Sequence, residues 1–216
     1  MTSRHSAAVW DSVHKEREIL IRDLGSLTAE QWALPSLCPG RDIHDVLAHL
    51  VESAKTTHLG FLRQMTAARF DFDRATAQGI ARERAATPEA TLAEFRRVRG
   101  ATTTPPASLT TRLVEVIVHG EDIRRPLGLE RSYPSDSIDA ALRYQLRTGV
   151  SMGGGRERAA GYRLLASDSK SEYGSGSKVE GASLALLMAV SGRPVRKEVS
   201  GEGAEVFVGT LAQASF

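Results

Sequence analysis

The sequence predicts a mainly α-helical protein in two parts, a helical domain over residues 1–150 and a small α+β domain over residues 156–216. Apolar residues recur at helical spacing through the first part, and capping signals separate the stripes. A glycine-rich segment at residues 149–155 is typical of a hinge or linker. Beyond it, short strand-like stretches flank one strongly apolar helix.

The first three helical segments have clear boundaries. An apolar stripe runs from Val9 to Leu24, and Gly25 predicts its end. Thr28-Ala-Glu-Gln31 is a capping box that opens a short helical turn. Asp42 can cap the next helix, whose apolar positions begin at Ile43 and predict a single helix to about Ala68.

Four further helical segments complete the first part. A break at residues 70–73 precedes a weaker helical segment that extends to about Ala86. Three stronger helices follow, and their start signals are Thr87-Pro88-Glu89, Thr110 or Thr111, and Tyr133-Pro134. Gly128 predicts the end of the second of these three.

The C-terminal part mixes strands with one helix. Tyr162–Ala166 is expected to form a strand, and Gly181–Val190 a buried helix that Gly192 ends. Residues 195–199 and 205–208 are expected to form two short strands.

Composition limits the class of protein. The net charge is +2, from 28 basic and 26 acidic residues, so no nucleic-acid partner is expected. The single cysteine, Cys38, excludes an internal disulfide framework and is expected to be a structural residue rather than a redox thiol. No apolar run approaches the roughly 20 residues of a membrane span, and the N-terminus lacks an apolar signal core. We therefore expect a cytoplasmic protein without a membrane partner.

Three side chains suggest a metal site. Glu115 and His119 are four residues apart, so on a helix they lie on one face. His49 lies in a second apolar helical run. An unpaired buried carboxylate is costly, and two histidines with one carboxylate form an open three-ligand site for a catalytic divalent metal. Asp45 and Asp122 are candidates to orient the ligand histidines.

A simpler interpretation stays open at this point. Glu115 can instead pair with Arg112 or Arg124, with the histidines satisfied inside the core. His44 and His58 are expected to be solvated helix residues.

Two segments carry a family resemblance. Leu37-Cys-Pro-Gly40, followed by residues 41–50, and the stretch Arg112–Gly128 resemble the two histidine signatures of the mycothiol-dependent maleylpyruvate isomerase family. Tyr173–Ala182 resembles that family's sterol-carrier-like C-terminal domain. Arg41 and Tyr173 stand where the family usually has tryptophan, which leaves the substrate open.

The resemblance implies a DinB-like four-helix bundle that binds zinc or a similar dication through His49, Glu115 and His119. It also implies mycothiol as cosubstrate, held as a thiolate that attacks an electrophilic small molecule in an isomerase or S-transferase reaction. Arg193 is the candidate catalytic residue for recognising the substrate, and Arg82 and Arg84 could serve equally well.

Two other functions stay open. One is a non-catalytic small-molecule carrier with a structural metal, and the other is a stress-related binding protein on the same scaffold. The expected assembly is a monomer or a weak homodimer.

Overall fold

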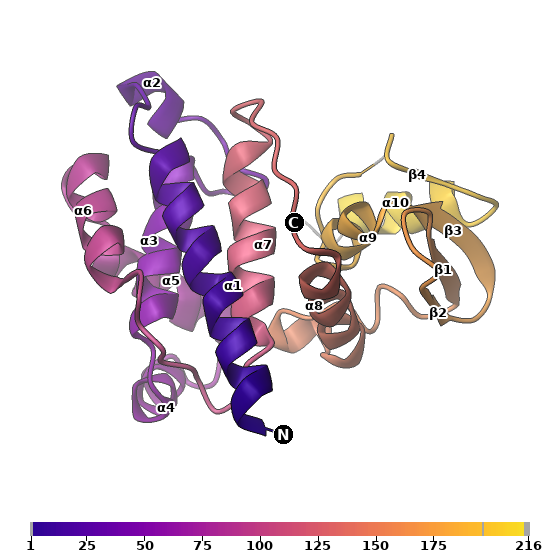
Figure 1. Ribbon diagram of the computed structural model, residues 1–216, viewed down its shortest axis with the longest axis horizontal. Helices are drawn as coiled ribbons and strands as arrows, with labels where there is room; N and C mark the ends of the chain where they lie inside the picture. The colour runs from indigo at the N-terminus through magenta and orange to yellow at the C-terminus, as the bar shows by residue number, and fades with distance from the viewer. Residues whose placement is uncertain (1, 196, 214–216) are drawn as a thin grey trace. The chain divides into compact units, whose positions relative to one another are not determined.

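The computed structural model describes residues 2–195 and 197–213, and it divides into two compact units, residues 1–131 and 132–216 (Figure 1). The sequence analysis placed the division at residues 150–156. By compactness, the last helix predicted for the first domain groups with the C-terminal unit. None of the helices within the described residues is long and apolar enough to cross a membrane.

The first unit is helical throughout. Its helices are α1 (Thr2–Asp23), α2 (Ala29–Trp32), α3 (Ile43–Lys55), α4 (His58–Ala67), α5 (Phe72–Glu83), α6 (Pro88–Val98) and α7 (Thr111–Arg124). Helices α1, α7, α3 and α6 form a closed ring of neighbours, which is the arrangement of a four-helix bundle. Helix α5 packs against α3, and α4 packs against α5. The mainly α fold predicted for this part is confirmed.

The predicted capping residues begin their helices. Thr28 and Asp42 each accept a hydrogen bond from the N3 backbone N–H and complete a capping box. Thr87 caps α6, with Pro88 in the first turn. These local signals therefore fix where α2, α3 and α6 start.

The prediction of one helix from Ile43 to about Ala68 was wrong. Thr56 has an extended backbone, and its hydroxyl donates to the carbonyl oxygen of Glu52 at 3.0 Å. Thr57 then caps a new helix by accepting from Gly60 N–H. Threonine side chains that bond to nearby backbone groups compete with helix continuation, and two in succession end α3.

The core of the first unit lies among α1, α2, α3, α6 and the end of α7. It consists of fully or nearly buried residues: Leu20, Leu24, Trp32, Ile43, Val46, Leu47, Leu50, Val51, Ala54, Leu92, Phe95, Val98 and Ile123. Their helical spacing on α3 gives that helix one continuous apolar side.

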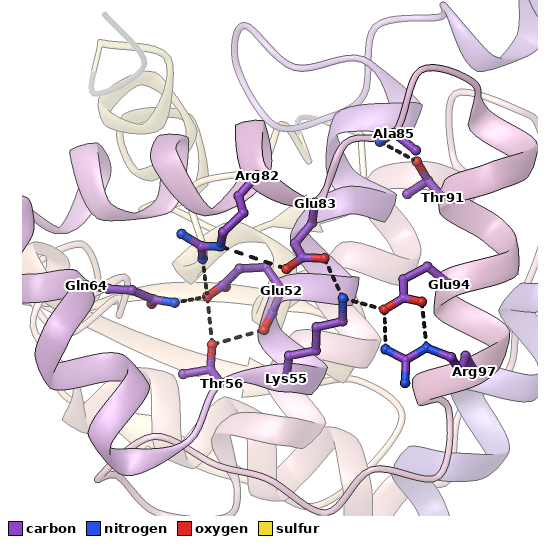
Figure 2. Close-up of polar contacts among 10 residues, drawn as sticks. All are labelled: Glu52, Lys55, Thr56, Gln64, Arg82, Glu83, Ala85, Thr91, Glu94 and Arg97. Carbon is purple, nitrogen blue, oxygen red and sulfur yellow. Dashed lines mark hydrogen bonds and ion pairs between the residues drawn. The ribbon is translucent and has the colours of Figure 1, made fainter.

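A polar network fixes the C-terminal half of α3 to its neighbours (Figure 2). Oε1 of the buried Glu52 accepts from Gln64 of α4 at 2.9 Å. Lys55 forms ion pairs with Glu83 of α5, at 2.6 Å, and with Glu94 of α6. Helix α3 is thus tied to α4, α5 and α6.

The second unit combines a small sheet with helices. Its elements are α8 (Ser135–Arg147), η1 (Val150–Met152), β1 (Tyr162–Ala166), β2 (Glu172–Gly174), β3 (Ser177–Gly181), α9 (Ser183–Val190), β4 (Val199–Ser200) and α10 (Ala204–Gln213). The strand order is β2-β1-β3-β4, with β1 and β3 parallel and both outer pairs antiparallel. Helix α9 packs against β1, β3 and α8, which explains why it is apolar on all sides.

The α+β prediction is confirmed, but two elements differ from it. Residues 205–208 belong to helix α10. The strand expected over residues 195–199 includes residue 196, which lies outside the described residues, and the strand found there is β4, Val199–Ser200. Phe207 and Val208 are both buried while Val206 is exposed, which is a helical pattern. A short apolar run does not distinguish helix from strand.

Candidate metal centre

Helix α7 places two potential ligands on one face. Glu115 and His119 are one helical turn apart, and Nε2 of His119 lies 3.8 Å from Oε2 of Glu115. Both side chains are half-buried. Because the residues around them, Val116, Ile117 and Val118, are buried, this pair is the polar part of an apolar helix segment.

Helix α3 supplies the third potential ligand. Nε2 of His49 lies 3.3 Å from the same Glu115 oxygen, Oε2. The rings of His49 and His119 meet edge to face, with centroids 4.7 Å apart. The structure therefore brings together the three side chains that the sequence singled out, with one ligand atom from each within 4.8 Å of the others.

The charges of the three side chains are strongly coupled. Burial alone would lower the pKa of His49, but the Glu115 carboxylate raises it above its ordinary value. Burial acts in the opposite sense on Glu115, where His49, Arg112 and His119 hold the pKa well below the ordinary value. The Glu115 carboxyl is thus ionised over the whole physiological pH range, and a carboxylate must be ionised to bind a metal cation.

Asp122 orients one of the histidines, as expected from its position three residues after His119. The side chain of Asp122 is fully buried, and its Oδ2 lies 2.9 Å from Nδ1 of His119. A carboxylate only accepts, so Nδ1 of His119 donates, and in the neutral ring Nε2 keeps its lone pair. That tautomer directs the lone pair toward the Glu115 side of the ring.

Cys38 contacts the same carboxylate. Its Sγ donates to Oδ2 of Asp122 at 3.3 Å, and the neighbouring Leu37 N–H donates to the Asp122 carbonyl oxygen at 3.1 Å. The loop before α3 is thereby attached to α7. Cys38 is half-buried, and a second candidate group of cation-binding atoms consists of Cys38, His119 and Asp122.

Two expectations about this region were wrong. Asp45 does not orient His49: it caps the start of α3, and its Oδ1 accepts from Arg84 at 2.9 Å. Nδ1 of His49 is buried and has no hydrogen-bond partner among residues 2–195 and 197–213. His44 is not solvated but 4% exposed, with Nε2 2.7 Å from Thr91 Oγ1. His58 is exposed, as expected.

The simpler interpretation of Glu115 accounts for only one of its oxygens. The buried Arg112 reaches Oε1 at 3.9 Å, while its Nη1 donates to Ser53 at 2.6 Å. Arg124 pairs instead with Asp23 of α1 at 2.7 Å. Oε2 of Glu115 is buried beside the two imidazoles, 3.3 Å from Nε2 of His49, and makes no hydrogen bond to any residue that the structure describes.

A second arginine near this site was not singled out by the sequence analysis as a site residue. Arg17 is buried in α1, where its Nη1 donates to the Arg99 and Ala101 carbonyl oxygens. Burial, and then Arg112, lower the pKa of Arg17 to about 10, while Glu115 acts to raise it. The sequence feature that could have identified Arg17 is its position inside the apolar stripe of the first helix.

The other arginine candidates have local partners. Arg84 pairs with Asp42 and Asp45, and Arg82 approaches Glu52 at 3.8 Å. Arg193 follows α9 in the second unit, where its side chain donates to the Ser191 carbonyl oxygen. Its catalytic role stays a prediction.

The three potential ligands fit a divalent cation on the structure's own evidence. Two atoms bound at 2.0–2.2 Å to one tetrahedral ion stand about 3.3–3.6 Å apart. The two nitrogens lie 3.3 and 3.8 Å from Glu115 Oε2. Within the described part of the chain, this buried carboxylate oxygen makes no hydrogen bond and has an imidazole nitrogen on either side, and a cation between the three atoms would satisfy it.

Comparison with known proteins agrees with the helical fold. Residues 13–103 match the family described as mycothiol maleylpyruvate isomerase N-terminal domain. The family takes its name from an isomerase. A search of curated proteins finds no match.

Two crystal structures share the fold of nearly the whole chain. One is the mycothiol-dependent maleylpyruvate isomerase, at 17% identity, and the other is a histidine-to-alanine mutant of that enzyme, at 16%. Each superposes with a TM-score of 0.66 and covers 92% of this chain and 93% of its own.

Proposed function

We propose that the protein is a divalent-metal-dependent enzyme that activates a low-molecular-weight thiol, mycothiol, for attack on an electrophilic small molecule. The observation that carries the proposal is the convergence of His49, Glu115 and His119 around one buried carboxylate oxygen. The reaction would be an isomerisation or an S-transfer. The family and the two structural neighbours support the isomerase class.

The chemistry needs only three ligands from the protein. A divalent cation, when bound, acts as a Lewis acid that favours the thiolate form of a thiol near neutral pH. His49, Glu115 and His119 would hold the cation, and a set of three leaves a position for a small molecule. Zinc is the metal we expect, because it accepts this mixture of nitrogen and oxygen ligands.

The surrounding residues prepare the ligands. Asp122 retains the proton on Nδ1 of His119, so that Nε2 is free to coordinate. Arg112 lies 3.9 Å from the other oxygen of Glu115 and, with His49 as the larger cause, lowers the pKa of that carboxyl. Arg193 would bind an anionic group of the substrate, because a guanidinium matches a carboxylate in geometry and charge.

Metal content tests the site directly. We expect about one equivalent of zinc in wild-type protein purified without chelator, and a loss of zinc in His49→Ala. His58→Ala is the matched control, because His58 is exposed on α4 and outside the cluster. Equal zinc in His49→Ala and wild type would contradict the assignment.

Thiol consumption tests the activity. Metal-loaded protein is expected to consume mycothiol in the presence of maleylpyruvate or a chlorinated aromatic, and His49→Ala is not. Arg193→Gln is expected to raise KM for an anionic electrophile more than for a neutral one. Bound zinc without turnover of any electrophile would favour the carrier function with a structural metal.

A further inference from the structure

The second unit contains a cavity that the proposed function does not use. Its volume is about 410 Å³, and all of its lining residues lie between positions 143 and 174. They come from α8, from the loop before β1, and from β1 and β2, which Figure 1 labels. The cavity is therefore a property of this unit by itself.

The lining is cationic. Arg143, Arg147 and Arg156 contribute three guanidinium groups, and no acidic residue lines the cavity. Arg143 and Arg147 are four residues apart on α8, so they share one side of that helix. A group of arginines with no carboxylate among the lining residues attracts an anion, and the planar guanidinium matches a carboxylate with two parallel hydrogen bonds.

Two of the three arginines are held in place by carboxylates. Nε of Arg143 donates to Asp139 at 2.8 Å, and its guanidinium lies over the Tyr173 ring, 5.1 Å from the centroid. Arg156 donates to Glu157 at 2.6 Å. Among the residues that the structure describes, Arg147 makes no ion pair or hydrogen bond. Its charge is thus available to a ligand.

The rest of the lining is apolar or aromatic. Leu164 and Tyr173 are buried, and Leu146, Tyr162 and Ala159 complete the apolar surface. Cavities that hold small organic molecules measure about 300–1,000 Å³ and combine an apolar wall with a few polar groups. The volume and the wall favour an organic anion over an inorganic one.

We propose that this cavity is a binding site for a compact organic acid, with its ring or chain against Tyr162, Leu164 and Tyr173 and its carboxylate at Arg147. None of the lining residues belongs to the first unit, which holds all three potential ligands of the metal centre. Its function would be to hold an acid without chemical change.

The test uses the full-length protein with 2-naphthoate as the probe and 2-naphthalenemethanol as a neutral molecule of the same shape. Amide resonances are followed by ¹H–¹⁵N NMR during titration. We expect saturable shifts for naphthoate that include Gly174 and Ala160, weakened by added salt because the attraction is between charges. The alcohol should bind at least tenfold more weakly, which is roughly the contribution of one charged hydrogen bond.

Two variants and a control locate the site. Arg147→Gln removes the unpaired charge and should weaken naphthoate roughly tenfold. Ala160→Phe places a ring in the cavity from an exposed position and should abolish binding. Arg163→Gln is the matched control, since Arg163 is exposed on β1, adjacent in sequence to Tyr162 and Leu164 and therefore on the other face of the strand.

The proposal would be overturned by the absence of saturable shifts with naphthoate at millimolar concentration, by equal affinity for the alcohol, or by unchanged affinity in both Arg147→Gln and Ala160→Phe. An equal loss of binding in Arg163→Gln and Arg147→Gln would also overturn the proposal, because such a loss would show that binding depends on the overall charge of the protein.

Discussion

Asp122→Asn should weaken metal binding without removing a ligand. In the wild type, the carboxylate accepts from Nδ1 of His119 at 2.9 Å in a fully buried position. The amide has no charge, and it can present its NH₂ group to the ring instead of an oxygen. The loss of a carboxylate that orients a ligand histidine typically lowers metal affinity about 10- to 100-fold, or about 1.4–2.7 kcal/mol.

The measurement is a competition for Zn²⁺ between the protein and a chelator of known affinity. The matched control is Asp45→Asn, which makes the same chemical change in a carboxylate that caps α3 and pairs with Arg84. This control should lose helix stability and keep its zinc affinity. Equal zinc affinity in Asp122→Asn and wild type, with both folded by circular dichroism, would refute the role assigned to Asp122.

Three further predictions concern stability. Gly155→Ala should destabilise the second unit by about 1–3 kcal/mol in urea unfolding, because the added Cβ would lie 2.2 Å from the Val190 carbonyl oxygen. The control is Gly100→Ala, whose added Cβ meets nothing within 4 Å, so this variant should be neutral or slightly stabilising. Phe95→Ala should cost about 3–5 kcal/mol, because this ring is fully buried, and a smaller loss would mean that the core refills the cavity. Two cations lower the pKa of Glu94 from 4.5 to about 2, so its stabilising effect is complete above pH 4.5 and is lost as the pH falls through 2. The stability difference between wild type and Glu94→Gln should therefore shrink over that interval, and a constant difference would contradict the ion pairs.

Local signals in the sequence accounted for most helix starts and for the candidate site. Thr28, Asp42 and Thr87 act through neighbours within three residues, so their effect can be predicted without tertiary structure. Glu115 and His119 are related in the same way by one helical turn. His49 was suggested as the third ligand by its apolar helical run and then by the family resemblance, but its contact with them depends on the packing of α3 against α7, which is not encoded locally.

The sequence-based predictions were wrong where contacts between distant parts of the chain determine the position of a side chain or the type of an element. Asp45 is four residues from His49, but its carboxylate accepts hydrogen bonds from the distant Arg84 and from the backbone N–H of Asp42 instead. His44 is polar, yet Thr91 offers it a buried hydrogen-bond partner. Residues 205–208 satisfy a strand pattern and a helix pattern equally. Cys38 and Arg17 gave little signal, since their contacts are with residues more than 80 positions away.

The ion pair between His49 and Glu115 has a consequence for how the centre is loaded. With the pKa of His49 raised by its neighbour, a proton on the imidazole can balance the carboxylate when no cation is present. Uptake of a metal is then an exchange of one positive species for another. Metal-free protein can consequently stay folded at mildly acidic pH, and metal binding should release protons that lower the pH of an unbuffered solution.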